Sequence, residues 1–324
     1  MDFVILWVDD KDQKWREEYE KYSLLEEEGK RIFHFRNWEN LHYWFRGVEK
    51  FAPWVDRIFL ITAGQTPSWL NTSHPKLRLI FHEEYIPKEL LPTFCSNTIE
   101  LFLHKIPDLS EHFVLFNDDF FIINKIKPER FFQRGKPVDI CAMNVYDGSG
   151  VSSNCMCNLE VINRHFDKKD VILKDIFKWF SFRNGKKLLR TFLLIWWPQF
   201  VGFYEHHLPQ PFLKSIHEEV WKKESKAIID SVRPRFRKKT NLTQYLYRYW
   251  QLVTGNFTCR NIYSDSVVFQ LDNKNLDKVV NIILKQKKNI IVINDAEDLD
   301  FEKAKQRVNH AFGTILQEKS SFEK

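Results

Sequence analysis

The sequence lacks the motifs that identify several common kinds of enzyme and metal site. Neither the P-loop pattern GxxxxGK[ST] nor the dinucleotide pattern GxGxxG occurs in its 324 residues. The five cysteines are an odd number and form no paired CxxC site, although Cys155 and Cys157 make one CxC. The sequence therefore disfavours nucleotide binding through either glycine-rich loop and disfavours structural zinc. Reduced thiols in a cytosolic protein are the simplest interpretation.

The sequence also lacks a long apolar run and a linker, and we expect no leader. The N-terminal stretch MDFVILWV has no basic region and no cleavage site, and it is too short to span a bilayer. We expect a cytoplasmic protein, in which the sequons at Asn71, Asn241 and Asn256 carry no meaning because glycosylation requires export. Without a Gly/Ser-rich linker or a repeat, we expect one domain over residues 1–324, with a helical insertion at 160–204.

The charge balance is close to even. The chain holds 49 basic and 43 acidic residues, which gives a formal charge of +6. Such an excess suits an anionic substrate or an anionic membrane surface, and it does not require nucleic acid. We expect no nucleic-acid partner.

Short apolar runs that end abruptly in polar residues recur along the chain. They cover residues 3–10, 57–65, 76–84, 112–119 and 289–298. Runs of this kind predict buried strands. The stretches at 40–52 and 96–106 between them have helical spacing, and Ser96 is the expected cap of the second. The alternation predicts an α/β protein whose Rossmann-like, largely parallel sheet is flanked by helices.

Two adjacent carboxylates, Asp118 and Asp119, lie inside the apolar run FVLFNDDFFI. Burying an unpaired charge is costly, so such acids usually have a cation, a metal or a hydrogen-bonding partner. Ligands bind beyond the carboxyl ends of parallel strands, and neighbouring carboxylates there can hold Mg²⁺ or Mn²⁺ together with phosphate and water. A capped turn explains the same three letters NDD equally well. The residues alone favour a metal-dependent enzyme acting on a phosphorylated substrate.

Two further segments carry chemistry-bearing side chains. HHLPQP fixes His206 and His207 beside two prolines, where one of them could shuttle protons, or both could form a packed surface pair. RPRFRKK contains Arg233, Arg235 and Arg237, whose guanidinium groups match phosphate geometry, although such runs are usually solvated faces.

The segment at 160–204 is rich in Lys, Arg, Phe and Trp. Its composition suits either an interfacial surface or a helical cover of the core. We therefore expect a peripheral contact with the inner face of the membrane as one alternative. Residues 218–250 have a helical pattern as well.

Four stretches together resemble the Stealth family of sugar-phosphate transferases. They are DFVILWVDDKDQKW (2–15), the region from RNWENLHYWFRG to HFVLFNDDFFI (36–122), the region from EHHLPQPFLKS to YRYWQLVTG (205–255), and INDAEDLDFEKAKQRVNHAFGTILQEKSSFE (293–323). They occur in the family's order and cover nearly the whole chain.

The resemblance implies a single catalytic domain that transfers sugar-1-phosphate from a UDP-sugar to a hydroxyl of a glycan acceptor. The product would be a phosphodiester in a capsule or exopolysaccharide, UMP would be released, and the acceptor would be free or lipid-linked. The alternatives are a metal-dependent UDP-sugar glycosyltransferase, which forms a glycosidic bond, and a non-catalytic membrane- or polysaccharide-binding protein.

The resemblance also implies roles for particular residues. Asp118 and Asp119 match the family's metal and phosphate site, His207 its HxP step, and Arg237 its phosphate-binding arginine, with Asp2 as an alternative base. Polar positions matching the donor-binding regions are Asp9, Arg46, Gly64, Gln65, Ser96, Asn97, Glu100 and Asn117. Departures from the pattern at His42, Trp44, Ala63 and Asn241 leave the donor sugar and the acceptor geometry open.

Overall fold

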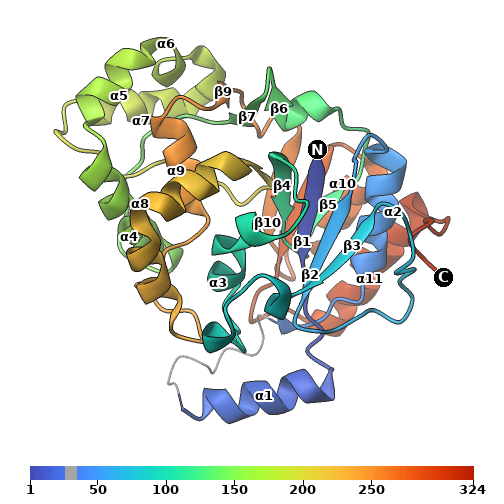
Figure 1. Cartoon of the computed structure of the whole chain (residues 1–324). Helices are drawn as coiled ribbons and strands as arrows, with labels where there is room; N and C mark the ends of the chain where they lie inside the picture. Colours follow the sequence, from blue (N-terminus) through green and yellow to red (C-terminus); the bar gives the residue numbers. More distant parts are fainter. Residues whose placement is uncertain (26–34) are drawn as a thin grey trace.

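A five-stranded sheet forms the centre of the computed structural model, which describes residues 1–25 and 35–324 (Figure 1). Its strands run in the order β3-β2-β1-β4-β8. They span Asp2–Leu6 (β1), Ile58–Thr62 (β2), Leu77–Phe81 (β3), His112–Phe116 (β4) and Gln210–Leu213 (β8). The first four are parallel, and β8 runs antiparallel to β4. The parallel arrangement brings the carboxyl ends of β1 and β4 to the same edge.

Nearly continuous burial explains why β1, β2 and β4 form the central strands, whereas β3 lies at the edge. Every residue of β2 is buried, and Ile5 of β1 is aligned with both Leu60 and Phe116. Parallel strands that are covered on both faces are apolar throughout, without a polar alternation. The strands expected at 3–10, 57–65, 76–84 and 112–119 are thereby confirmed.

The fifth expected strand lies in a second sheet. β11 (Ile290–Asn294) pairs in parallel with β10 (Ser266–Gln270) and antiparallel with β5 (Phe120–Ile122). A third small sheet contains β6 (Phe132–Gln133), β7 (Lys136–Asp139) and β9 (Thr258–Cys259). Because β5 directly follows the turn after β4, the acid pair lies where the chain passes from the first sheet to the second.

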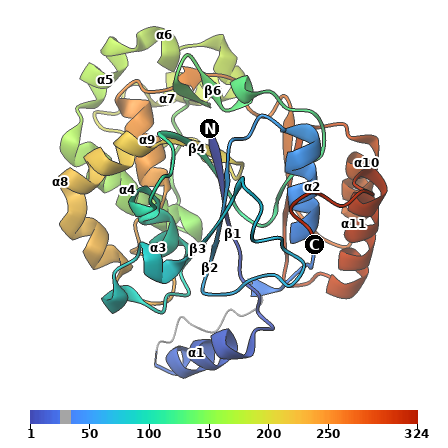
Figure 2. The same cartoon turned by 45° about the vertical axis from the view of Figure 1, so that its right-hand side comes forward.

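Helices cover both sides of this framework (Figure 2). On one side lie α2 (Leu41–Phe51), α10 (Leu276–Lys285) and α11 (Phe301–Ile315), and on the other lie α3 (Ser96–Leu101), α4 (Val151–His165), α8 (Lys214–Val232) and α9 (Tyr245–Val253). Helix α1 (Gln13–Ser23) lies at one end. The contact of α2 with β5 requires Gly47, because a Cβ there would come within 2.6 Å of the Ile122 carbonyl oxygen.

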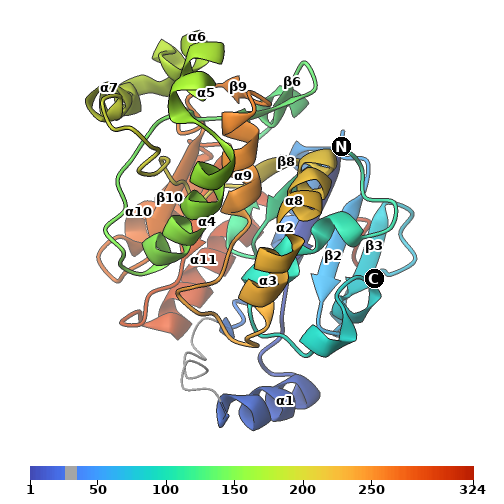
Figure 3. The same ribbon diagram turned by 60° about the vertical axis from the view of Figure 1, so that its left-hand side comes forward.

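Residues 160–204, expected to be a helical insertion, lie in a run of short helices that begins before residue 160. Helix α4 starts at residue 151, and α5 (Lys168–Lys174), α6 (Ile176–Trp179), a 3₁₀ helix at Phe182–Lys187 and α7 (Leu188–Leu194) follow. Figure 3 shows α5, α6 and α7 together at the end of the molecule opposite α1. Among the described helices, none has the length and apolar character needed to cross a bilayer.

Three local predictions were wrong. The cap of α3 is Cys95, and Ser96 is its first helical residue. The helix expected at 96–106 ends at Leu101, before a 3₁₀ turn at Leu103–Lys105. The helical pattern at 218–250 is interrupted between Val232 and Tyr245, because Pro234 lacks the N–H group that would continue the helical hydrogen bonds.

Candidate active site

A cavity of about 1650 Å³ lies beyond the carboxyl ends of β1, β4 and β11. Asn117, Asp118 and Asp119 line it from the turn after β4, and His207 lines it from the segment before β8. Arg237 and its two lysine neighbours line it from the loop between α8 and α9. The topology therefore brings together the acid pair, the histidine and the arginine, which lie far apart in the sequence.

The two acids of the pair have different surroundings. Asp119 is fixed: its carboxylate Oδ2 lies 3.1 Å from His207 Nε2, and its carbonyl accepts a hydrogen bond of 3.0 Å from Ile293 N. Asp118 is exposed to the cavity, and its carboxylate makes no ion pair with any described residue. The pair therefore offers one anchored and one free carboxylate at the end of β4.

The surroundings in the cavity raise the pKa values of both Asp118 and His207, the two groups beside Asp119. Asp118 is accessible to water, yet protein surrounds it on most sides; this desolvation, followed by the charge of Asp119, raises its pKa to about 7. Burial lowers the pKa of His207, but the hydrogen bond and charge of Asp119, with the charge of Glu100, outweigh burial and raise it. A site that holds two such carboxyl groups close together attracts a cation.

Arg237 lines the same cavity as the acid pair. Its Nη2 donates a hydrogen bond of 2.7 Å to Ser96 Oγ at the start of α3. One turn further along α3, burial raises the pKa of Glu100 to about 7, although the charges of Arg237 and His207 act in the opposite direction. The side chains of Ser96 and Glu100 thus place the guanidinium at the cavity.

The structure separates the two histidines that the sequence left equivalent. His206 is buried, and its Nε2 lies 3.1 Å from the carboxylate of Asp139, which also binds Arg248 at 2.8 Å. His206 therefore belongs to a buried ion network, whereas His207 reaches the acid pair. The two histidines of HHLPQP therefore do not form a packed surface pair, and His207 lies in the cavity beside Asp119.

Sequence reasoning missed Arg36 at the cavity rim. Its guanidinium binds Asp295 through two hydrogen bonds of 2.9 and 2.7 Å, and Asp295 follows β11. Asp295 was visible as an acid at a strand end, but nothing in the sequence links Arg36 to it across 259 positions.

Three of the predicted donor-binding residues form a braced turn beside the cavity. The side-chain amide of Gln65 donates to the Asp9 carbonyl at 2.8 Å and accepts from the Asp9 N–H at 2.9 Å. Gly64 provides the positive φ of 91° that this turn requires. Asn37, which lines the cavity, donates to Asp9 Oδ1 at 3.0 Å. Asp9, Gly64 and Gln65 therefore hold the wall in place and do not themselves line it.

Arg46 and Asp2 lie elsewhere, and Asn97 is buried within α3. Arg46 forms a bidentate pair with Glu323, with both distances 2.7 Å, and thereby anchors the C-terminal Ser-Ser-Phe-Glu segment on α2. Asp2 is fully buried at the start of β1 and binds Arg57 at 2.9 Å. Neither ion pair is among the residues that line the cavity, so the structure does not bring these residues to the acid pair.

The two carboxylates suit a metal ion that takes its remaining ligands from the substrate. In the described part of the chain, no group of three or more His, Cys, Asp and Glu side chains could enclose an ion. Mg²⁺ is nevertheless commonly bound by one or two carboxylates, with water and substrate phosphates as its other ligands. Asp118 and the free oxygen of Asp119 fit that mode and do not fit a preformed structural metal site.

Comparison with known proteins gives close, full-length relatives. A family model described as Stealth protein CR2, conserved region 2, matches residues 34–139. A capsular polysaccharide phosphotransferase WcwK of Streptococcus pneumoniae is 40% identical over 100% of this chain and 98% of its own length. The receptor polysaccharide phosphotransferase WefC of Streptococcus gordonii is 38% identical, with the same coverage. The exopolysaccharide phosphotransferase cps2G of Lactiplantibacillus plantarum is 36% identical over 100% of this chain and 96% of its own.

Among solved structures, a galactosyltransferase in complex with donor and acceptor sugar analogues gives a TM-score of 0.41 at 10% identity, covering 96% of each chain. The family model overlaps the second of the four sequence regions, and the relatives align over the whole chain. The chain belongs to the Stealth family.

Proposed function

We propose that this protein is a phosphotransferase that moves sugar-1-phosphate from a UDP-sugar to a hydroxyl group of a glycan acceptor, in the synthesis of a surface polysaccharide. The names of its full-length relatives support the reaction class and the polysaccharide product. The observation that carries the proposal is that Asp118, Asp119, His207 and Arg237 line one large cavity.

The cavity offers both signs of charge that a pyrophosphate requires. Arg237 and the lysines beside it can hold phosphate oxygens, since a guanidinium matches them with a planar fork. The acid pair in the same cavity can hold a metal ion whose remaining ligands are water and the donor's phosphates. With Mg²⁺ or Mn²⁺ bound at Asp118 and Asp119, that ion would neutralise charge on the pyrophosphate.

In the proposed reaction, the acceptor oxygen attacks the β-phosphorus of the donor. A new oxygen–phosphorus bond forms, the bond from the β-phosphorus to the bridging oxygen breaks, and UMP leaves with that electron pair. His207 in its neutral form donates its Nε2–H to Asp119, which leaves Nδ1 to take the proton of the acceptor hydroxyl. Arg237 stabilises the charge that develops on the leaving phosphate.

The nucleotide product tests this proposal. The purified protein is incubated with Mg²⁺, a panel of UDP-sugars and oligosaccharide acceptors, and the nucleotide is separated by chromatography. We expect UMP, together with a product whose phosphorus resonance is that of a diester. Asp119→Asn serves as the control for background hydrolysis.

Stoichiometric UDP with no phosphorus in the product would overturn the proposal. That result would identify a glycosyltransferase, because attack at the anomeric carbon leaves both phosphates on the nucleotide.

A further inference from the structure

The helices α5 to α7 expose an unusual number of large apolar side chains. Of the fifteen exposed large apolar residues in the described part, nine lie between residues 173 and 197. Phe177, Phe182 and Trp196 are 91%, 92% and 88% exposed. The nine are Leu173, Ile176, Phe177, Phe182, Leu189, Phe192, Leu193, Trp196 and Trp197. We call them, with the basic residues among them, the α5–α7 face. Exposed apolar side chains gathered on neighbouring helices point to an interaction site.

The same segment carries the charge excess of the whole chain. Residues 168–197 contain eight of the 49 basic residues and two of the 43 acidic ones, so their formal charge is +6. The remaining 41 basic and 41 acidic residues cancel. Lys169, Lys174, Arg183, Lys186 and Arg190 are exposed beside the apolar side chains. The positive charge of this protein is therefore concentrated where its exposed aromatic residues are.

The face is held firmly from beneath. Trp179 is fully buried against Phe200 at 5.6 Å between ring centroids, while its neighbour Phe177 points outward. The buried ammonium of Lys168 binds the carbonyl oxygens of Leu194, Ile195 and Trp197 at 2.7, 3.1 and 2.6 Å. These contacts fix the turn that carries Trp196 and Trp197, so its exposed aromatic rings are presented on an ordered support.

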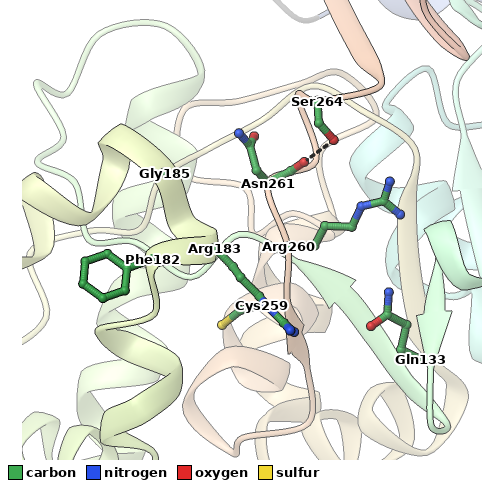
Figure 4. A pocket seen from close by; sticks show the side chains of 8 residues that line it. All are labelled: Gln133, Phe182, Arg183, Gly185, Cys259, Arg260, Asn261 and Ser264. Atoms are coloured by element: carbon green, nitrogen blue, oxygen red, sulfur yellow. Dashed lines mark hydrogen bonds between the residues drawn. The ribbon is translucent and has the colours of Figure 1, made fainter.

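A hollow of about 400 Å³ adjoins the face (Figure 4). Figure 4 shows Phe182 and Arg183 extending in different directions from the same 3₁₀ helix, with Arg183 lining the hollow. No described residue accepts a hydrogen bond from the Arg183 guanidinium, whereas Arg260 on the other side binds Asp265 at 2.6 Å. The amides of Gln133 and Asn261 complete a polar lining that can accommodate one phosphate group.

We propose that the α5–α7 face docks onto an anionic phospholipid bilayer, with its aromatic side chains in the headgroup region and a lipid phosphate beside Arg183. The combination selects this occupant: aromatic side chains favour the bilayer interface, and each Lys or Arg near an anionic surface adds attraction. A second copy of this chain is disfavoured as the occupant, because two such faces, each with a formal charge of +6, would repel each other. The proposal does not depend on which reaction the cavity performs.

Vesicle binding tests the proposal without any activity assay. The protein is centrifuged with vesicles of phosphatidylcholine alone and with vesicles that contain phosphatidylglycerol at 30 mol%. We expect binding to the anionic vesicles at low salt and its release as salt screens the charges. Lys169→Gln/Lys174→Gln/Lys186→Gln should lower partitioning roughly a hundredfold, at about fivefold per lysine. Phe177→Ser/Phe182→Ser/Trp196→Ser should abolish it, and Arg183→Gln should lower it about fivefold.

Matched variants on the opposite side of the molecule provide the control. Lys274, Lys285 and Lys287 are exposed on or beside α10, and Leu284 is an exposed apolar residue there. Lys274→Gln/Lys285→Gln/Lys287→Gln and Leu284→Ser should bind like the unchanged protein. Equal loss in these controls, or equal binding to neutral and anionic vesicles, would overturn the proposal. So would an absence of vesicle binding, with a dimer in sedimentation velocity that the three serine substitutions abolish, since that result would assign the face to a second copy.

Discussion

At the scale of single residues, Asp118 gives the most direct test of the metal assignment. Asp118→Asn keeps the side-chain volume but removes a negative charge from the proposed ligand pair. We expect transfer to fall by a factor of 1000 or more, on the order of 4 kcal/mol in the barrier, and Mn²⁺ binding measured by electron paramagnetic resonance to be lost. The thermal unfolding temperature should not fall, because Asp118 forms no ion pair with a described residue and its raised pKa means that the ionised carboxylate does not stabilise the fold.

The exposed Asp298 provides a control at a distance from the cavity lining. Asp298→Asn should retain both Mn²⁺ binding and turnover. Full turnover of Asp118→Asn in the presence of a chelator would contradict the metal site.

Arg237 and Arg233 lie four residues apart and differ in surroundings. Arg237 donates to Ser96 at the cavity, whereas Arg233 is exposed and binds Asp230 at 3.3 Å. Arg237→Lys keeps the charge but loses the planar fork, so we expect kcat/KM to fall by roughly ten- to a hundredfold. Arg233→Lys should change kcat/KM less than twofold. Similar kinetics for both variants would mean that charge alone, without guanidinium geometry, suffices at position 237.

At the scale of elements, the Arg46–Glu323 pair connects the C-terminal segment to α2. Arg46 and Glu323 are 13% and 5% exposed, and Arg46 also donates to the Leu316 carbonyl at 2.9 Å. Removing one member leaves the other charge nearly buried, which should cost about 3 kcal/mol in free energy of unfolding. We expect that loss for Arg46→Met and for Glu323→Leu in urea unfolding, and clearly less than the sum for the double variant.

The same variants distinguish a structural role from donor binding. Because neither side chain lines the cavity, the folded fraction of each variant should keep the KM for the donor. An increased KM at unchanged stability would return Arg46 to the donor site, where the family resemblance places it.

The sequence predicted elements wherever local pattern decides structure. All five expected strands formed, because segments such as Ile58–Thr62 can be buried throughout and fit the interior of a parallel sheet. Strands β5 and β10 were not predicted. The apolar letters of β5 continue those of β4, so only the pairing of Phe121 with Ile291 shows where the second sheet begins. The break in the α8 region follows from Pro234, a signal that was present but was outweighed by the flanking helical pattern.

The candidate site was predictable only where unusual side chains stood out. Asp118 and Asp119 contrast with their apolar neighbours, and His207 lies beside prolines, so both features were visible in the sequence. Arg36 and Asp295 were not visible as a pair, because their contact depends on how two distant loops meet. The resemblance matched Arg46 by position in a region, and a matched region includes the contacts that hold the fold together as well as those that bind ligand.

At the scale of the whole molecule, buried histidines make stability depend on pH. Burial lowers the pKa of His82 and His206 to about 4, that of His104 to about 3, and that of His217 well below the usual 6.5. The unfolded chain binds these protons near pH 6.5, while the folded chain resists them. The stabilisation is therefore complete above pH 6.5 and is lost as the pH falls toward 4. Asp118 and Glu100, whose pKa values are raised to about 7, act in the opposite sense and offset part of this loss.

His217 allows one of these protons to be measured separately. Its ring is fully buried, stacks on Tyr247 with 3.6 Å between centroids, and has no hydrogen-bond partner at either nitrogen among the described residues. His217→Phe therefore preserves the packing and removes one titrating group. Between pH 6 and pH 4.5 we expect the unchanged protein to lose about 1.4 kcal/mol per pH unit more than this variant. Urea unfolding at each pH measures the difference, and His310→Phe at an exposed position should keep the original slope. Equal slopes for the unchanged protein and His217→Phe would mean that His217 accepts its proton inside the folded protein.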